Sequence, residues 1–146
     1  MASPIYTGFM YAASKDALAV NALVQASIQD HSEAIAFHCQ QAAEKMVKAV
    51  FTENGQVPPK SHDIGDLLST AIEQAWLKAS QPAIQAAIDL TLYAVAARYE
   101  TTPDISIGEA TKAIKDCNFV ATMLADNGYE YVTVHTEDAP EANALI

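Results

Sequence analysis

Lys45 and Lys48 lie on the polar side of the stretch 34–51, and they are the first candidates for chemistry in this chain. The sequence of 146 residues holds only eight Lys and Arg residues against 18 Asp and Glu residues. Its single arginine, Arg98, follows an apolar stretch that is typical of another helix. If the two helices adjoin, these three cations would form a local anion site. Arg98 would hold a phosphate with two hydrogen bonds, and Tyr99 would stack on a base.

The same residues also have structural interpretations. Glu44 and Lys48 are spaced i,i+4, which suits an ion pair on one helix face. Arg98 at the C-terminal end of a helix would interact favourably with the helix dipole and bond the last carbonyl oxygens. Phe37 and Phe51 fall toward the polar side, which suits a homodimer face. The sequence leaves a binding site, a structural role and a dimer face open.

The histidines and cysteines do not form the motifs of a metal or nucleophile site. A di-iron bundle needs Glu-x-x-His pairs on its helices. The residues three positions before the four histidines are Ile28, Ile35, Pro59 and Val132. His31 and His38 are seven residues apart, and no carboxylate or thiol completes a metal set with them. The chain also lacks the Gly-rich phosphate loops, Gly-x-Ser-x-Gly and Cys-x-x-Cys, so we expect no metal and no cofactor.

Composition restricts the partners and the compartment. The formal net charge of −10 argues against binding to duplex DNA, because such binding needs several Lys or Arg to displace counterions. Cys39 and Cys117 fall at apolar helix positions, which is typical of buried thiols in a reducing compartment. No basic segment precedes an apolar run at the start, and no apolar run approaches about 18 residues. We therefore expect a cytoplasmic protein with neither a signal peptide nor a membrane span.

Hydrophobic periodicity predicts five helices and no paired strand. The expected helices span about 14–29, 32–53, 63–75, 82–97 and 106–126. We expect an all-α, up-and-down bundle of four to five helices over 14–128, with an N-terminal arm over 1–13 and an extended tail over 129–146. The helix at 82–97 is apolar almost all round, which predicts a central position for it.

The helix ends and the tail can be predicted from local chemistry. Ser32 is expected to cap the second helix, and Ser61 or Asp63 the third. Ser106 and Glu109 have the Ser-x-x-Glu spacing of a capping box. The stretch YEYVTVH that follows alternates like a strand but has no second strand to pair with. We expect it to pack as an extended segment on the bundle or on a neighbouring subunit.

Four stretches, in this order, resemble the HEPN domain family, which is named for its occurrence in higher eukaryotes and prokaryotes. They are FHCQQAAEKMVKAV (37–50), VPPKSHDIGDLL (57–68), LYAVAARYE (92–100) and SIGEATKAI (106–114). The resemblance covers residues 14–126, which is nearly the whole predicted bundle. It implies a helical bundle, often dimeric, that often works with a minimal nucleotidyltransferase, here on a separate chain.

The recurring polar positions of the family carry over to eight residues of this chain, and the resemblance makes them the expected ligand-binding residues. They are His38, Gln41, Glu44, Lys45, Lys48, His62, Arg98 and Tyr99. For His62 the structural alternative is that its side chain braces the loop at Pro58-Pro59 against the helix at 32–53.

One branch of the family consists of metal-independent ribonucleases that use an Arg-x4–6-His motif across a dimer cleft. At those positions Arg98 is followed by Pro103, Asp104 and Ile105 and not by a histidine. The resemblance therefore points to the branch without ribonuclease activity and to no catalytic residue. We expect a homodimer that binds either a nucleotide or a separate nucleotidyltransferase.

Two alternatives stay open. The first is a toxin-type ribonuclease, as in toxin–antitoxin pairs, with an atypical catalytic set such as His62 and Arg98. The second is a purely structural dimerisation module with Phe37 and Phe51 in its interface.

Overall fold

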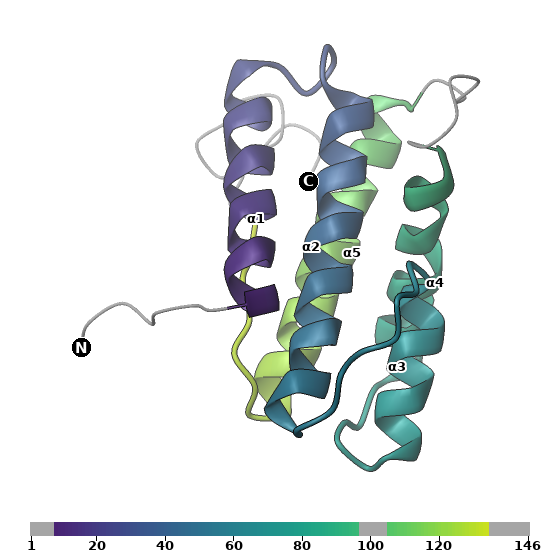
Figure 1. Ribbon diagram of the computed structural model, residues 1–146. Helices are drawn as coiled ribbons and strands as arrows, with labels where there is room; N and C mark the ends of the chain where they lie inside the picture. The colour runs from purple at the N-terminus through teal and green to yellow at the C-terminus, as the bar shows by residue number, and fades with distance from the viewer. Residues whose placement is uncertain (1–7, 97–104, 135–146) are drawn as a thin grey trace.

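The computed structural model describes residues 8–96 and 105–134, and these residues form five α-helices and no strand (Figure 1). The helices are α1 (Gly8–Ala26), α2 (Ser32–Glu53), α3 (Ile64–Glu73), α4 (Gln81–Ala96) and α5 (Ile107–Asp126). In Figure 1, α1, α2, α4 and α5 alternate in direction, and the shorter α3 lies beside α4. The predicted all-α, up-and-down bundle is confirmed. None of the described helices is both long and apolar enough to cross a membrane.

The central helix of the bundle is α2. It packs against α1, α3, α4 and α5, whereas α4 packs against α2, α3 and α5. Ile88 and Leu92 of α4 face outward, with 46% and 67% of their surface exposed. The prediction that the helix at 82–97 is central was wrong. A helix with apolar residues on all sides can be buried, but this pattern does not determine how many other helices pack against it.

Both the apolar and the polar sides of α2 are largely buried. The predicted apolar face is confirmed, since Ile35, Cys39 and Met46 are fully buried. On the other side of the helix, Gln40 and Glu44 are only 0% and 3% exposed. Burying polar groups is unfavourable unless they find hydrogen-bond partners. The central position of α2 therefore depends on how its polar side chains are paired.

Two of the predicted helix caps are confirmed and one was wrong. The Asp63 carboxylate accepts a hydrogen bond from the backbone N–H of Asp66 at 3.0 Å and caps α3. Ser106 and Glu109 make both bonds of the capping box at the start of α5. Ser32, in contrast, is the first residue of α2, and its hydroxyl donates to the Ile105 carbonyl oxygen at 2.5 Å. Its side chain joins the start of α2 to the segment before α5.

The first helix begins earlier than the sequence pattern predicts. It starts at Gly8, not near Ser14, and ends at Ala26. Met10 and Ala13, which belong to the expected arm, are buried on the same side as Ala17 and further apolar residues. The aromatic residues of the first segment hid this periodicity, because they interrupt the apolar stripe with exposed side chains such as Tyr11.

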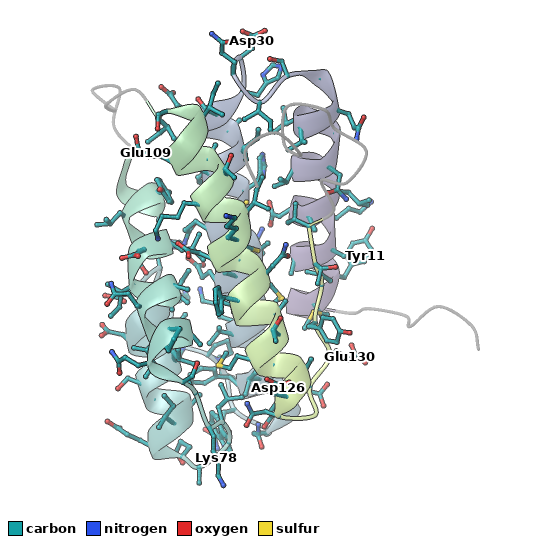
Figure 2. The ribbon with its side chains drawn as sticks, turned by 180° about the vertical axis from the view of Figure 1, so that it is seen from behind. Tyr11, Asp30, Lys78, Glu109, Asp126 and Glu130 are labelled. Carbon is teal, nitrogen blue, oxygen red and sulfur yellow. The ribbon has the colours of Figure 1, made fainter. Side chains whose placement is uncertain are left out.

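Residues 129–134 form an extended segment that packs on the bundle. Figure 2 shows it running back between α1 and α5. The side-chain amide of Asn118 binds the backbone of Val134 twice, accepting from its N–H at 2.9 Å and donating to its carbonyl at 3.1 Å. Val132 and Val134 are both buried, and the Val132 N–H points to the Met46 sulfur at 3.4 Å. Of the two expected packing modes, packing on the bundle holds for these residues.

Candidate functional site

The polar side chains of α2 are organised around two buried carboxylates. Asp16 comes from α1 and Glu44 from α2, and they are 7% and 3% exposed. Each carboxylate binds one lysine and one histidine. We refer to the Asp16 cluster (Asp16, His38, Lys45) and to the Glu44 cluster (Gln40, Gln41, Glu44, Lys48, His62).

The Asp16 cluster joins α1 to α2. His38 Nδ1 lies 2.8 Å from one oxygen of Asp16, and Lys45 Nζ lies 2.6 Å from the other. The His38 and Phe37 rings also form a T-shaped contact, with 5.4 Å between ring centroids. The three charged or titratable groups therefore satisfy one another across the helix interface, and this pairing is what allows Asp16 to be buried.

The Glu44 cluster joins α2 to the loop before α3. His62 Nδ1 lies 3.1 and 3.3 Å from the two oxygens of Glu44, and Lys48 Nζ lies 3.2 Å from Oε2. The Gln40 amide donates to Glu44 Oε1 at 2.8 Å, and the Gln41 amide donates to Gln40 Oε1 at 2.6 Å. The predicted Glu44–Lys48 pair and the predicted bracing of the loop by His62 are both confirmed.

The His62 ring is the most exposed part of the Glu44 cluster. Its side chain is 45% exposed, compared with 10% for Lys48 and 4% for Glu44. An ionised carboxylate only accepts hydrogen bonds, so Nδ1 of His62 carries the hydrogen in this contact. Nε2 then keeps a free lone pair when the ring is neutral and becomes a donor when the ring is protonated. Glu44 thus fixes both the orientation and the tautomer of an exposed imidazole.

The comparison with known proteins places the chain in a family. The family model of the HEPN domain matches residues 13–135. The chain belongs to the HEPN domain family. No curated protein and no solved structure matches it. The family match confirms the resemblance based on the four motif stretches, and HEPN is an all-α fold, in agreement with the five helices.

In this HEPN domain the predicted ligand-binding residues divide between the two clusters. Gln41, Glu44, Lys48 and His62 meet in the Glu44 cluster, and His38 and Lys45 meet Asp16 instead. The two remaining predicted residues lie outside the described residues. They are Arg98 and Tyr99. The six described residues thus belong to two hydrogen-bonded networks that both include side chains of α2.

The lysines of α2 do not contribute surplus positive charge. Lys45 is paired with Asp16 and Lys48 with Glu44, so the two lysines and two carboxylates sum to zero. The predicted anion site therefore cannot rest on these lysines alone. An anion would have to be held by the exposed edge of an imidazole or by cations beyond the two clusters.

Two residues of the clusters were missed by the sequence analysis. Asp16 stands three residues after Ala13 and four before Val20, within the buried stripe of α1. Gln40 shares a helix side with Val47, which is also fully buried. A polar residue in register with buried apolar residues is the signal that could have identified both.

Phe51 belongs to the core and not to a dimer face. It is 3% exposed, and its ring packs edge-on against Trp76 with 5.2 Å between ring centroids. The prediction that Phe51 lies in a homodimer interface was therefore wrong. Its position on the polar side of α2 is explained by the cover that Trp76, after α3, gives to that side.

The cysteine beside His38 is not an activated nucleophile. Cys39 of α2 and Cys117 of α5 are both free and fully buried, as predicted. Burial raises the pKa of the Cys39 thiol well above its usual value, and the hydrogen bond with Cys117 raises it further. The protonated thiol is a poor nucleophile. Within residues 8–96 and 105–134, no group of three or more His, Cys, Asp or Glu side chains could hold a metal ion.

Proposed function

We propose that this HEPN domain binds a nucleotide without catalysing a reaction, and that the Glu44 cluster is part of its binding site. The observation that carries the proposal is the contact of the half-exposed His62 ring with the buried Glu44 carboxylate. An apolar core of similar volume is often as stable as a buried polar network, although removing one member of such a network is costly. Its one strongly exposed member is a histidine held in a fixed orientation.

The chemistry of His62 suits a nucleotide. When neutral, Nε2 can accept a hydrogen bond from a ribose hydroxyl or from the amino group of a base. When protonated, it can donate to a phosphate oxygen with the added strength of a charge. Because Glu44 already fixes the ring, binding does not have to order it. In this proposal Arg98 and Tyr99, which follow α4 in the sequence, supply the phosphate contact and the base contact expected of them.

Within the part of the chain that the structure describes, the His62 ring has no second acid–base partner apart from the Glu44 carboxylate that holds it, and this favours binding over catalysis. Cleavage of RNA needs one group that takes a proton and another that gives one. Among the described residues, His38 is engaged with Asp16 in a different cluster, and Lys48 is paired with Glu44. Arg98 also lacks the histidine spacing of the ribonuclease branch.

Calorimetric titration with ATP, GTP and a short RNA tests the proposal. We expect at least one of them to bind the wild-type protein. His62→Ala should weaken that ligand by about tenfold or more, because a hydrogen bond to a charged group contributes roughly 1.5–3 kcal/mol. His38→Ala is the matched control, because it removes the same ring from the other cluster. Absence of heat for all three ligands, or equal losses in the two variants, would contradict the proposal.

One observation favours a second candidate function. A carboxylate that orients an imidazole is also the arrangement that prepares a general base, so the Glu44–His62 pair suits a toxin-type ribonuclease with an atypical catalytic set. Incubation of total RNA with wild-type and His62→Ala protein decides between the two. Cleavage by the wild type that disappears in the variant would favour the ribonuclease. Identical RNA profiles would exclude it.

The family resemblance adds two proposed partners, a separate minimal nucleotidyltransferase and a second copy of this chain. The outward-facing side chains of Ile88 and Leu92 offer apolar surface for either. Light scattering on the wild type and on Leu92→Glu tests the homodimer, since the variant places a charge on exposed surface without touching the core. A monomeric wild type would remove this part of the proposal.

A further inference from the structure

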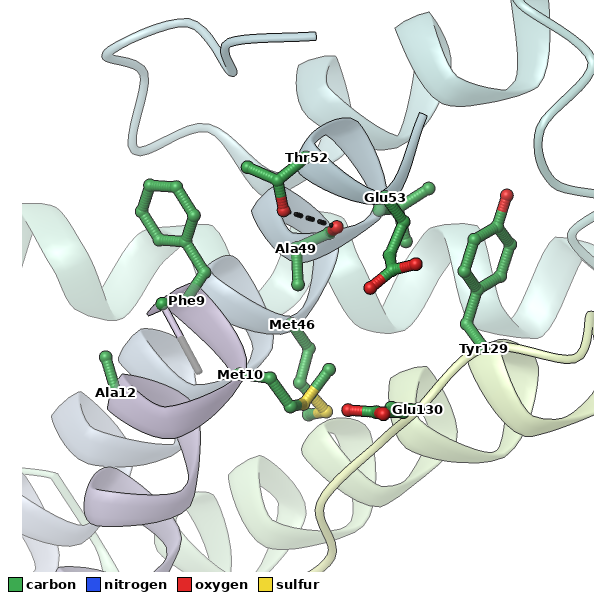
Figure 3. A pocket seen from close by; sticks show the side chains of 11 residues that line it. Phe9, Met10, Ala12, Met46, Ala49, Thr52, Glu53, Tyr129 and Glu130 are labelled. Carbon is green, nitrogen blue, oxygen red and sulfur yellow. Dashed lines mark hydrogen bonds between the residues drawn. The ribbon is translucent and has the colours of Figure 1, made fainter. Parts of the chain in front are cut away.

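A cavity of about 530 Å³ lies where the first turns of α1, the last turns of α2 and residues 129–130 meet (Figure 3). Its size falls in the range of small-molecule sites, roughly 300–1,000 Å³. It lies on the α1 side of α2, whereas His62, in the loop before α3, marks the Glu44 cluster. Neither of the two clusters contributes a residue to it. The cavity is therefore a separate candidate site.

Most of the wall of the cavity is apolar or has its polar atoms already engaged. Phe9 and Ala12 of α1 and the ring of Tyr129 supply half-buried carbon surface, and the buried Met10 and Met46 complete the lining. The Tyr129 hydroxyl donates to the Trp76 carbonyl at 3.1 Å, and the hydroxyl of Thr52 donates to the Ala49 carbonyl at 2.8 Å. A ligand therefore meets mainly apolar and aromatic surface in this part of the cavity.

Two carboxylates at the cavity have no partner among the described residues. Glu53 ends α2 and Glu130 lies in the segment after α5, and neither makes a hydrogen bond or an ion pair there. Figure 3 shows both side chains pointing toward the cavity from these two elements. Both are exposed to solvent, unlike the buried Asp16 and Glu44, whose charges are balanced by lysines. Two unpaired acceptors with a net negative charge select for a cationic donor.

We propose that this cavity binds a small amphiphilic amine. The apolar part of the amine lies against Phe9, Ala12 and Tyr129, and the ammonium group lies between Glu53 and Glu130. The ring of Tyr129 adds a surface that attracts cations. The negative charge of the whole chain repels anions from the same place. This site is independent of the proposed nucleotide site.

Calorimetry with phenylbutylamine, phenylbutanol and phenylbutyrate tests the proposal, because the three probes share an apolar part and differ in charge. We expect the amine to bind best and the carboxylate not to bind. Glu53→Gln and Glu130→Gln should each weaken the amine by up to about fivefold, since a partly exposed ion pair contributes up to about 1 kcal/mol. Neither variant should change the affinity for the neutral alcohol.

Two further variants serve as controls. Glu73→Gln removes the same charge from the exposed end of α3, away from the cavity, and should leave amine binding unchanged. Thr52→Phe fills the cavity from an exposed position and should abolish binding while the circular dichroism spectrum stays that of the wild type. Lack of amine binding by the wild-type protein would overturn the proposal. Equal affinity for the amine and the alcohol, or equal effects of Glu73→Gln and Glu53→Gln, would overturn it as well.

Discussion

The imidazole of His62 contacts both carboxylate oxygens of Glu44, at 3.1 and 3.3 Å, although the two residues are 18 positions apart and belong to different elements. Glu44 is buried within the central helix, and His62 stands half-exposed in the loop before α3. The pair therefore connects the core of the bundle to its surface. Both the proposed function and the prediction for Glu44→Ala rest on this contact.

Glu44→Ala should destabilise the fold strongly. The variant leaves Lys48 and Gln40 buried without their acceptor, and breaking a buried pair typically costs about 3–5 kcal/mol. Urea unfolding measures the change, with the exposed Glu73→Ala as the matched control. A loss below about 1 kcal/mol would show that the network is not needed for the central position of α2.

Asp16 and Lys45 should be energetically coupled. Each residue is the other's partner at 2.6 Å across the α1–α2 interface. A double-mutant cycle with Asp16→Asn and Lys45→Met is expected to give a coupling energy in the range of about 0.5–3 kcal/mol for a contacting pair. Additive effects of the two substitutions on the free energy of unfolding would contradict the pairing.

Phe51→Ala should lower stability, and Phe37→Ala should have a much smaller effect. Removing a buried phenylalanine costs about 3–5 kcal/mol, and the ring of Phe51 fills a site against Trp76. Thermal unfolding separates the two variants, because each kcal/mol shifts the midpoint by roughly 2–4 °C or more in a domain of this size. Equal shifts for both would place Phe51 on the surface after all.

The contribution of Asp89 to the stability of the bundle should be lost as the pH falls. Hydrogen bonds from Lys112, and then from Gln85, lower the pKa of Asp89 below its usual value. Such a group stabilises the fold above its unfolded pKa, and this stabilisation is lost as the pH falls through the folded pKa. Asp89→Asn should therefore reduce stability near neutral pH, by less than about 1 kcal/mol for an exposed pair.

The difference between Asp89→Asn and the wild type should disappear as the pH falls well below about 4. Burial raises the pKa of the neighbouring Asp116, although the hydrogen bond from Lys112 works against this. Asp116 therefore acts in the opposite direction, because the stability that it contributes is lost as the pH rises through its folded pKa. Urea unfolding of Asp89→Asn and of Asp116→Asn over this pH range separates the two contributions. If the difference in the free energy of unfolding between Asp89→Asn and the wild type grew on acidification, the lowered pKa of Asp89 would be contradicted.

Asn118→Ala should release the segment after α5. The Asn118 amide makes both backbone hydrogen bonds of Val134, and no strand partner replaces it among the described residues. Hydrogen exchange at the Val134 amide is expected to accelerate, while amides in the middle of α2 keep their protection. Unchanged exchange at Val134 would show that burial alone holds the segment.

Much of the fold could be predicted because local signals agreed with the packing. The Ser106–Glu109 spacing gave the start of α5, and the apolar positions 35, 39 and 46 gave the buried face of α2. The early start of α1 was missed because exposed aromatic residues such as Tyr11 obscure its stripe. The central position of α2, in place of α4, was missed because the number of helices that pack against a given helix depends on the tertiary arrangement.

The candidate site could be predicted by residue type but not by grouping. Motif resemblance selected His38 and His62, yet it could not show that one pairs with Asp16 of another helix and the other with Glu44. Helical spacing describes neighbours on one helix only. Contacts between helices, and the cancellation of the lysine charges, depend on the approach of separate elements.

The central claim is tested most directly by NMR of the histidine rings during titration with ATP and GTP. His38 is the internal reference, because its Nδ1 contacts a buried carboxylate, Asp16, as that of His62 contacts Glu44. The account predicts that the His62 ring resonances shift and saturate with the same dissociation constant that calorimetry gives, while those of His38 stay in place. Saturable nucleotide binding that leaves the His62 resonances unchanged, or no nucleotide binding at all, would contradict it.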